Sequence, residues 1–115
     1  MKFVALAIIT SSEHEDKMKK IAKEAGATGA TIIQARGSGY EEKKSFFSLT
    51  FEGNHTILLY LLEKKMSKSV LKAIKKDVDG DKSSVVAFTM PINDIVGLDQ
   101  NLLNSFEENI KTEEL

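Results

Sequence analysis

The chain has no cysteine and no tryptophan, and only one proline among its 115 residues. Without cysteine it can form neither disulfide bonds nor thiolate metal sites. Lys and Arg number 16 against 17 Asp and Glu, so the basic excess that nucleic-acid binders usually carry is also missing. These absences exclude a disulfide-stabilised domain and a cysteine zinc site, and they indicate no nucleic-acid partner.

No apolar run approaches the roughly 20 residues that a membrane-spanning helix needs. Residues 3–9 are continuously apolar and follow Met1-Lys2, as in a short signal sequence, but no convincing small-x-small cleavage site follows them. A buried central strand explains this run better. We therefore expect a cytoplasmic protein that is not embedded in a membrane.

A unit of strand, amphipathic helix and strand occurs twice. The first unit covers residues 3–10, 13–25 and 27–35, and the second covers residues 56–63, 66–77 and 84–90. This order predicts the α+β class and a ferredoxin-like βαββαβ sandwich, with an antiparallel sheet and two helices on one face. We expect one domain over residues 1–98 and a C-terminal helical extension over residues 99–115.

Both predicted helices carry a narrow apolar stripe. Ser12 and Glu15 fit a capping box at the start of the first helix, and Gly26 stands where a left-handed C-terminal cap is expected. The apolar positions recur at helical spacing; they are Met18, Ile21, Ala22 and Ala25 in the first helix, and Met66, Val70, Ala73 and Ile74 in the second. Each helix should therefore lie on a sheet with its lysines outward.

Two of the predicted strands, residues 3–9 and 57–62, are almost entirely apolar, as strands buried on both faces are. The helices can cover only one face of the sheet within a single chain. The opposite face would then expose a large apolar surface, which usually marks an interface. The pattern predicts an oligomer.

Two segments are ambiguous. Residues 45–51 also have the composition of a strand, which either forms a hairpin with the next strand or continues it as one long bent strand with a bulge. Pro91 should end the last strand, because it has no amide hydrogen to donate. Residues 92–96 are predicted to form a short helical turn.

Two glycine-containing segments are candidates for anion binding. Gly37, Ser38 and Gly39 follow a strand, and two glycines let backbone amides approach an anion, although a plain flexible turn fits the motif equally well. Residues 77–82 lack the glycine and glutamate spacing of a calcium loop. They predict either a helix-ending turn or an anion site formed by the Gly80 and Asp81 amides and the Lys82 ammonium.

No catalytic or metal-binding constellation stands out. His14 and His55 have no second histidine at ligand spacing, and no serine has a visible base partner. Asp94 and Glu107 stand alone, so no carboxylate pair for acid–base catalysis is evident. We expect neither an enzyme nor a metal site.

Four stretches together resemble the P-II signal-transduction family over about residues 3–98. Residues 20–31 resemble that family's transition from the first helix into the second strand, and residues 86–96 resemble its closing strand. Gly37, Ser38 and Gly39 stand at the entrance of the family's long T-loop. Gly80, Asp81 and Lys82 fall near the glycine-rich B-loop.

The resemblance implies a homotrimer whose clefts between neighbouring subunits bind ATP or ADP, and whose T-loops contact a regulated transporter or metabolic enzyme. It places three groups of residues around the nucleotide. Gly37, Ser38 and Gly39 form the cleft entrance; Gly80, Asp81 and Lys82 approach the phosphates; and Gly29, Ala30 and Thr31 of the neighbouring subunit meet the base or ribose.

The chain also departs from the family pattern. The loop after Gly39 is short, and Tyr40 does not match the modifiable tyrosine of the long T-loop. The two C-loop arginines are absent, and an exact fit of the closing strand places residues 83–86 at the B-loop position. The resemblance therefore implies a divergent P-II-like sensor with a short T-loop, in place of ordinary nitrogen signalling by uridylylation. No covalent cofactor is expected, and whether Mg²⁺ accompanies the nucleotide stays open.

Three alternatives remain. A CutA-like trimeric protein associated with metals or stress shares the same outline and would place metal ligands in the cleft. A small ferredoxin-like enzyme would need a convergent catalytic pair, which the sequence does not show. An assembly module without a ligand would not be stabilised by nucleotides.

Overall fold

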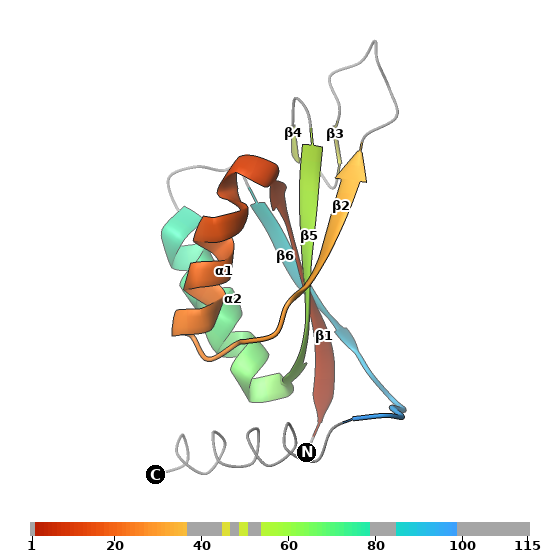
Figure 1. Cartoon of the computed structure of the whole chain (residues 1–115). Coiled ribbons are helices and arrows are strands. Elements are labelled where there is room, and N and C mark those ends of the chain that lie inside the picture. Colours follow the sequence, from red (N-terminus) through yellow and green to blue (C-terminus); the bar gives the residue numbers. More distant parts are fainter. Residues whose placement is uncertain (1, 37–44, 47–48, 51–53, 79–84, 99–115) are drawn as a thin grey trace.

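The computed structural model describes residues 2–36, 45–46, 49–50, 54–78 and 85–98. Four long strands form one antiparallel sheet in the order β2-β5-β1-β6. They are β1 (Phe3–Ser11), β2 (Thr31–Arg36), β5 (Asn54–Glu63) and β6 (Val85–Pro91). The helices α1 (Glu15–Glu24) and α2 (Lys64–Val78) lie side by side on one face of this sheet (Figure 1). The prediction of a ferredoxin-like α+β fold is confirmed.

The two strand–helix–strand units are interleaved. β1 and β2 run parallel with β5 between them, and β5 and β6 run parallel with β1 between them. β1 therefore has a partner on each side along most of its length, from Val4 opposite Leu62 and Pro91 to Thr10 opposite Thr56 and Val85. The segment predicted to be the buried central strand occupies that position.

The core lies between the sheet and the helices. On β1, Leu6 and Ile8 point to the helix side and are fully buried. Both helical stripes meet them there, as predicted, through Met18 and Ala22 of α1 and through Met66, Val70 and Ile74 of α2. An exposed ion pair, with Lys17 Nζ 3.0 Å from Asp77 Oδ2, joins the two helices.

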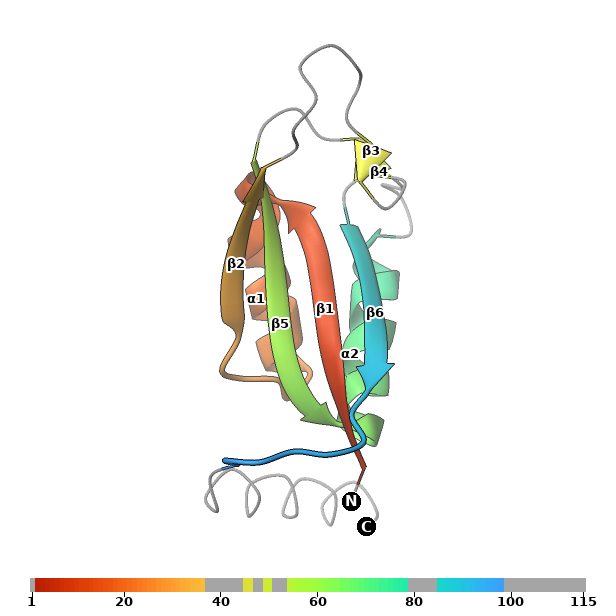
Figure 2. The same cartoon turned by 90° about the vertical axis from the view of Figure 1, so that its right-hand side faces the viewer.

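The opposite face of the sheet has no covering element among the described residues (Figure 2). Ile9 is buried there beneath its neighbours Ile57, Val86 and Phe88. Ile33 and Met90, further out on the same face, are each 42% exposed. The apolar residues of this face are Ala5, Ala7, Ile9, Ile33, Ile57, Leu59, Leu61, Val86, Phe88 and Met90. We call this surface the open face.

α1 ends in a Schellman motif. Gly26 has φ +106°, its amide donates to Lys23 O at 3.0 Å, and the Ala27 amide donates to Ala22 O at 2.8 Å. These bonds satisfy carbonyl groups that the end of a helix would leave without partners. The predicted glycine cap is confirmed.

The start of α1 differs from the prediction. Ser12 is not the N-cap of a helix over residues 13–25, because residues Ser12–His14 form a 3₁₀ turn before α1. The Ser12 hydroxyl instead lies 3.1 Å from Thr56 Oγ1 on the neighbouring strand. The predicted capping box is therefore wrong, since a tertiary partner takes the hydroxyl.

The second helix begins earlier than predicted. β5 passes directly into α2 at Lys64, two residues before the expected start. The Glu63 carboxylate accepts a hydrogen bond of 2.7 Å from the Lys65 amide. A carboxylate at this position satisfies a free amide of the first turn and is favoured by the helix dipole.

Three other segments also differ. Residues 27–30, predicted to be strand, form the irregular connector between α1 and β2, and β2 starts at Thr31. Within residues 45–51, β3 (Ser45–Phe46) pairs with β4 (Leu49–Thr50), so the stretch pairs with itself and neither predicted alternative holds. A short helical turn was predicted over residues 92–96. Residues 92–98 instead have no regular secondary structure and run past the start of β1 (Figure 2). The predicted extension over 99–115 lies outside the described residues.

We predict that Gly26→Ala lowers the free energy of unfolding by about 1–2 kcal/mol, the cost of a left-handed conformation for an L-residue with a Cβ. The nearest atom to an added Cβ is Met66 Cγ at 3.8 Å, an ordinary contact, so backbone strain and not a clash causes the loss. Urea unfolding at fixed protein concentration measures it.

Gly26→Asn is the matched control, because asparagine tolerates this conformation better and should cost less. Equal stability of the alanine variant and the parent protein would contradict the capping role.

Candidate functional site

Both candidate loops leave the sheet at the same end. β2 ends at Arg36 opposite Asn54, the first residue of β5, so residues 37–53 connect two neighbouring strand ends. Residues 79–84 connect the end of α2 to Val85, which pairs with Thr10 near the same end of the sheet. The six predicted site residues lie outside the described residues; they are Gly37, Ser38, Gly39, Gly80, Asp81 and Lys82. The end of β2 and the starts of β5 and β6, which flank them in the chain, lie at one end of the sheet (Figure 1).

A chain of polar side chains lies at the base of this end. Thr56, which is fully buried, has its Oγ1 3.1 Å from Ser12 Oγ and 3.5 Å from Gln34 Oε1. Gln34 Nε2 in turn donates to Glu15 Oε1 over 3.3 Å. These contacts connect the 3₁₀ turn, β5, β2 and α1. The positions of the two strand ends that carry residues 37–53 are therefore linked to the start of α1.

The two histidines occupy different surroundings at this end. His14 Nδ1 lies 2.8 Å from Ser11 Oγ and is half-buried, whereas His55 is 1% exposed on the open face. Within the described ranges, no three His, Asp or Glu side chains form a group that could hold a metal ion. The two histidines do not combine into a site.

The other three predicted site residues lie at the opposite end of β2. Thr31 pairs with Leu59, five residues from the Arg36–Asn54 pair, and a strand rises about 3.3 Å per residue, so the two ends are about 17 Å apart. Gly29 has φ +76°, and the Ala30 side chain packs against the helix-side core. Thr31 points to the open face. One chain therefore places the two halves of the predicted nucleotide site at opposite ends of a strand.

A pocket of about 280 Å³ adjoins this connector. Its walls come from α1, from the connector and from β5; the lining residues are Lys19, Lys23, Ala27, Thr28, Gly29, Ala30 and Tyr60. Gly29 and Ala30 were predicted as site residues, but Tyr60, Lys19 and Lys23 were not. The sequence pattern assigns the tyrosine to a buried strand and the lysines to a solvated helix face, so it contains no signal for a pocket.

Burial raises the pKa of Tyr60. The neutral phenol is therefore favoured in the folded chain, and its hydroxyl remains a hydrogen-bond donor at neutral pH.

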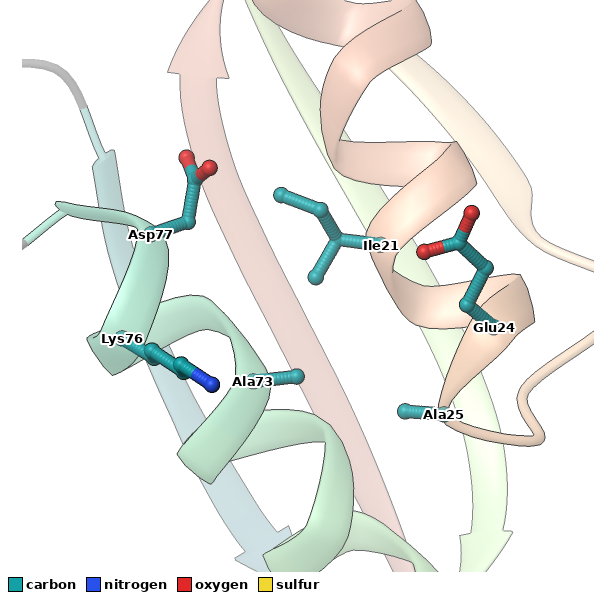
Figure 3. A pocket seen from close by; sticks show the side chains of 6 residues that line it. All are labelled: Ile21, Glu24, Ala25, Ala73, Lys76 and Asp77. Carbon is teal, nitrogen blue, oxygen red and sulfur yellow. The ribbon is translucent and has the colours of Figure 1, made fainter.

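A larger groove of about 520 Å³ lies between the two helices (Figure 3). Ile21, Glu24 and Ala25 come from α1 and its C-cap, and Ala73, Lys76 and Asp77 come from α2. Ala25 and Ala73 have only methyl side chains, so the surfaces of the two helices leave space between one another. Charges of both signs rim the groove, and Asp77 already pairs with Lys17. We interpret it as a packing feature of the helix pair.

An interleaved α+β sandwich with two helices on one face of its sheet and one open face defines a ferredoxin-like domain. The sequence matches the family Nitrogen regulatory protein P-II over residues 2–101. The chain therefore belongs to the P-II family, as its resemblance to that family implied. Among curated protein sequences, none matches the chain at a significant level.

Solved structures share the fold at low sequence identity. A PII-like signalling protein from Thermus thermophilus is 21% identical, with a TM-score of 0.60 over 80% of this chain and 87% of that one. CPII from Thiomonas intermedia, bound to ADP, AMP and acetate, is 17% identical, with a TM-score of 0.63 over 84% of this chain and 90% of that one. The apo form of CPII, a nitrogen regulatory PII-like protein, is 16% identical, with a TM-score of 0.60 over 80% and 90%. These likenesses establish the P-II-like fold.

Among the residues that the structure describes, no helix is long and apolar enough to cross a membrane.

We predict that Thr56→Val destabilises the protein by about 1 kcal/mol, because it removes a hydroxyl that contacts both Ser12 and Gln34. The exposed Thr89→Val on β6 is the matched control and should stay within about 0.5 kcal/mol of the parent. Urea unfolding of both variants makes the comparison. Equal losses in the two variants would mean that the polar chain adds nothing beyond ordinary strand propensity.

Proposed function

We propose that this chain is a P-II-like regulatory sensor that binds an adenine nucleotide, ATP or ADP, in clefts between the subunits of a homotrimer. The loop at residues 37–44 then controls a protein partner, either a transporter or a metabolic enzyme. Membership of the P-II family supports the signalling role. The structures of CPII bound to ADP and AMP, with acetate or bicarbonate, support an adenine nucleotide as ligand.

The separation of the two half-sites is the observation that carries the proposal. Residues 37–39 follow the end of β2, and residues 80–82 precede the start of β6 at the same end of the sheet, whereas Gly29 and Thr31 lie at the other end of β2. A single nucleotide can contact both groups only if the second comes from a neighbouring copy. A shared cleft of this kind requires an oligomer, and the open face offers an apolar surface through which the copies can associate.

The proposed chemistry at the phosphates is binding without turnover. Glycine amides and the Lys82 ammonium suit a polyphosphate in a partly dry cleft. Mg²⁺ can accompany the nucleotide through Asp79 or Asp81, whereas Asp77 already pairs with Lys17. The nucleotide acts on the partner only insofar as it binds two arrangements of the 37–44 loop with different affinities. We place this sensor in the cytoplasm and assign it no catalytic residues.

Two alternatives to this sensor are a CutA-like metal-associated trimer and a ligand-free assembly module. A metal-associated trimer needs three or more ligating side chains in the cleft, and the described residues of one chain do not supply a group of three by themselves. An assembly module would show unchanged melting across all nucleotides. The first experiment below separates both from the sensor.

Thermal unfolding with ATP, ADP and AMP, with and without Mg²⁺, tests the ligand. At one hundred times its dissociation constant a nucleotide should stabilise the protein by about 2.7 kcal/mol. We expect Lys82→Ala to lose most of this gain, while Lys72→Ala, an exposed lysine of α2, should keep it. A shift produced by divalent metals alone would favour the metal-associated alternative, and equal behaviour of the two variants would remove Lys82 from the site.

A pair of adjacent isoleucines tests the oligomer. Ile33 and Ile32 are 42% and 44% exposed, but Ile33 lies on the open face and Ile32 on the helix side. We expect Ile33→Asp to dissociate the trimer in light-scattering measurements, because it buries a charge in the interface. Ile32→Asp should remain trimeric. Dissociation of both variants, or of neither, would show that the open face is not the interface.

A further inference from the structure

We propose that residues 99–115 bind in the groove between α1 and α2 of their own chain. Apolar side chains of this segment cover Ile21, Ala25 and Ala73, and its carboxylates lie among the lysines of the two helices. The family match ends at residue 101, so most of the segment lies beyond the P-II pattern. The proposal does not depend on nucleotide binding.

The groove has an apolar floor that is open to the surface. Ile21 and Ala25 point toward α2, and Ala73 points toward α1, so the three side chains face one another across the groove (Figure 3). None of the three is fully buried, and the space between the helices is about 520 Å³. Large apolar side chains from outside the helix pair therefore have room here.

The segment has apolar side chains in a matching pattern. Leu102, Leu103, Phe106 and Ile110 recur at a spacing that places them on one face of a helix. In contact with water this stripe would be a contiguous apolar surface, and such surfaces usually mark an interaction site. The stripe therefore requires an apolar partner surface.

The two surfaces carry opposite charge. α1 and α2 hold ten lysines against four acidic residues, and nine of these lysines are exposed. Residues 99–115 hold five acidic residues against one lysine. Complementary charge steers association and selects between competing surfaces. The helix layer is thus suited to this segment.

The charges at the groove itself fit the same arrangement. Lys76 lines the groove, and Lys72 lies one turn away on the same side of α2. Neither forms an ion pair with a described residue. Asp77 already pairs with Lys17. Glu24 is exposed, so water screens its repulsion. The groove therefore offers cations that have no partner in the described fold.

The open face is the other apolar surface that the segment could cover, but its charges do not fit. No described strand residue that points to the open face is a lysine or an arginine. An acidic segment bound there would hold its carboxylates over a surface without cations. Charge therefore favours the groove.

The described chain also ends within reach of the groove. The Ile92 amide donates to Phe3 O at 3.2 Å, and the Lys64 amide donates to Lys2 O at 2.9 Å, so residues 92–98 leave the fold at the end where α2 begins. α1 ends at the same end of the sheet (Figure 1). As a helix, residues 99–115 would be about 25 Å long, enough to run along the groove.

A spin label tests the proposal, because the chain has no cysteine and one introduced cysteine gives a single attachment site. Asn104→Cys lies off the apolar stripe, and a nitroxide attached there broadens the amide signals of nearby residues. We expect broadening of the Ile21, Ala25 and Ala73 signals in the full chain. Broadening of Ile33 and Phe88 on the open face in their place, or none at all, would overturn the proposal.

Two aspartate variants of the labelled protein test the apolar contact. Phe106→Asp puts a charge on the stripe, and Asn101→Asp puts the same charge outside it. We expect the first to abolish the broadening, because burying a charge in the groove is costly, and the second to keep it. Equal broadening in the two variants would overturn the apolar contact.

Two glutamate variants test the charges. Lys76 and Lys75 are exposed lysines in the last turn of α2, but only Lys76 lines the groove. We expect Lys76→Glu to lower the bound population of the segment about fivefold, and Lys75→Glu to leave it near that of the parent. Equal losses would mean attraction without a defined site, and would overturn the groove as the site.

A mixed sample tests whether the contact lies within one chain. Isotope-labelled chains without a nitroxide are mixed with unlabelled chains that carry it. We expect no broadening of the Ile21, Ala25 and Ala73 signals in this sample. Broadening would place the segment on a neighbouring copy and overturn the contact within one chain.

Discussion

The position of β1 between two antiparallel partners is the constraint on which the rest of the structure depends. Its side chains alternate between two apolar faces: Leu6 and Ile8 meet both helices, and Ile9 meets the open-face residues. Two helices that belong to interleaved units can cover only the first of these faces. The strand that makes the core possible thus also leaves an apolar surface uncovered, and the proposed association with neighbouring copies rests on the same alternation.

The antiparallel pairing also divides the proposed nucleotide site. β2 runs from the connector at one end of the sheet to residues 37–53 at the other, so the residues proposed for the cleft entrance follow one end of this strand and those proposed for the base lie at the other. Association through the open face can bring the two together only between copies. In the proposed site, ligand binding and assembly are therefore linked by the topology of the sheet. The buried Thr56, with its links to Ser12 and Gln34, fixes the strand ends from which the 37–44 loop departs.

The sequence was sufficient to predict the two repeated units, both helical stripes and the glycine cap of α1, because each rests on local periodicity or on backbone conformation. The prediction failed at positions whose conformation depends on a residue that is distant in the sequence. The Ser12 hydroxyl bonds to Thr56 across the sheet, and residues 27–30 leave the strand because Ala27 and Ala30 pack against the helix-side core and Gly29 takes a positive φ. Nothing in the sequence around Tyr60 indicates a pocket, because the pocket forms only when α1 and the connector lie over this side chain. Of the nine predicted site residues, Gly29, Ala30 and Thr31 can be placed, and their roles remain proposals.

The connector between α1 and β2 and the first residue of β2 face different surroundings. Ala30 contacts the core beside the Tyr60 pocket, whereas Thr31, the next residue, points to the open face and to the proposed nucleotide cleft. The connector therefore joins the helix-side core to the proposed nucleotide cleft through two successive residues. Gly29, with φ +76°, lies at its centre, so the backbone conformation of this glycine helps to set the positions of both.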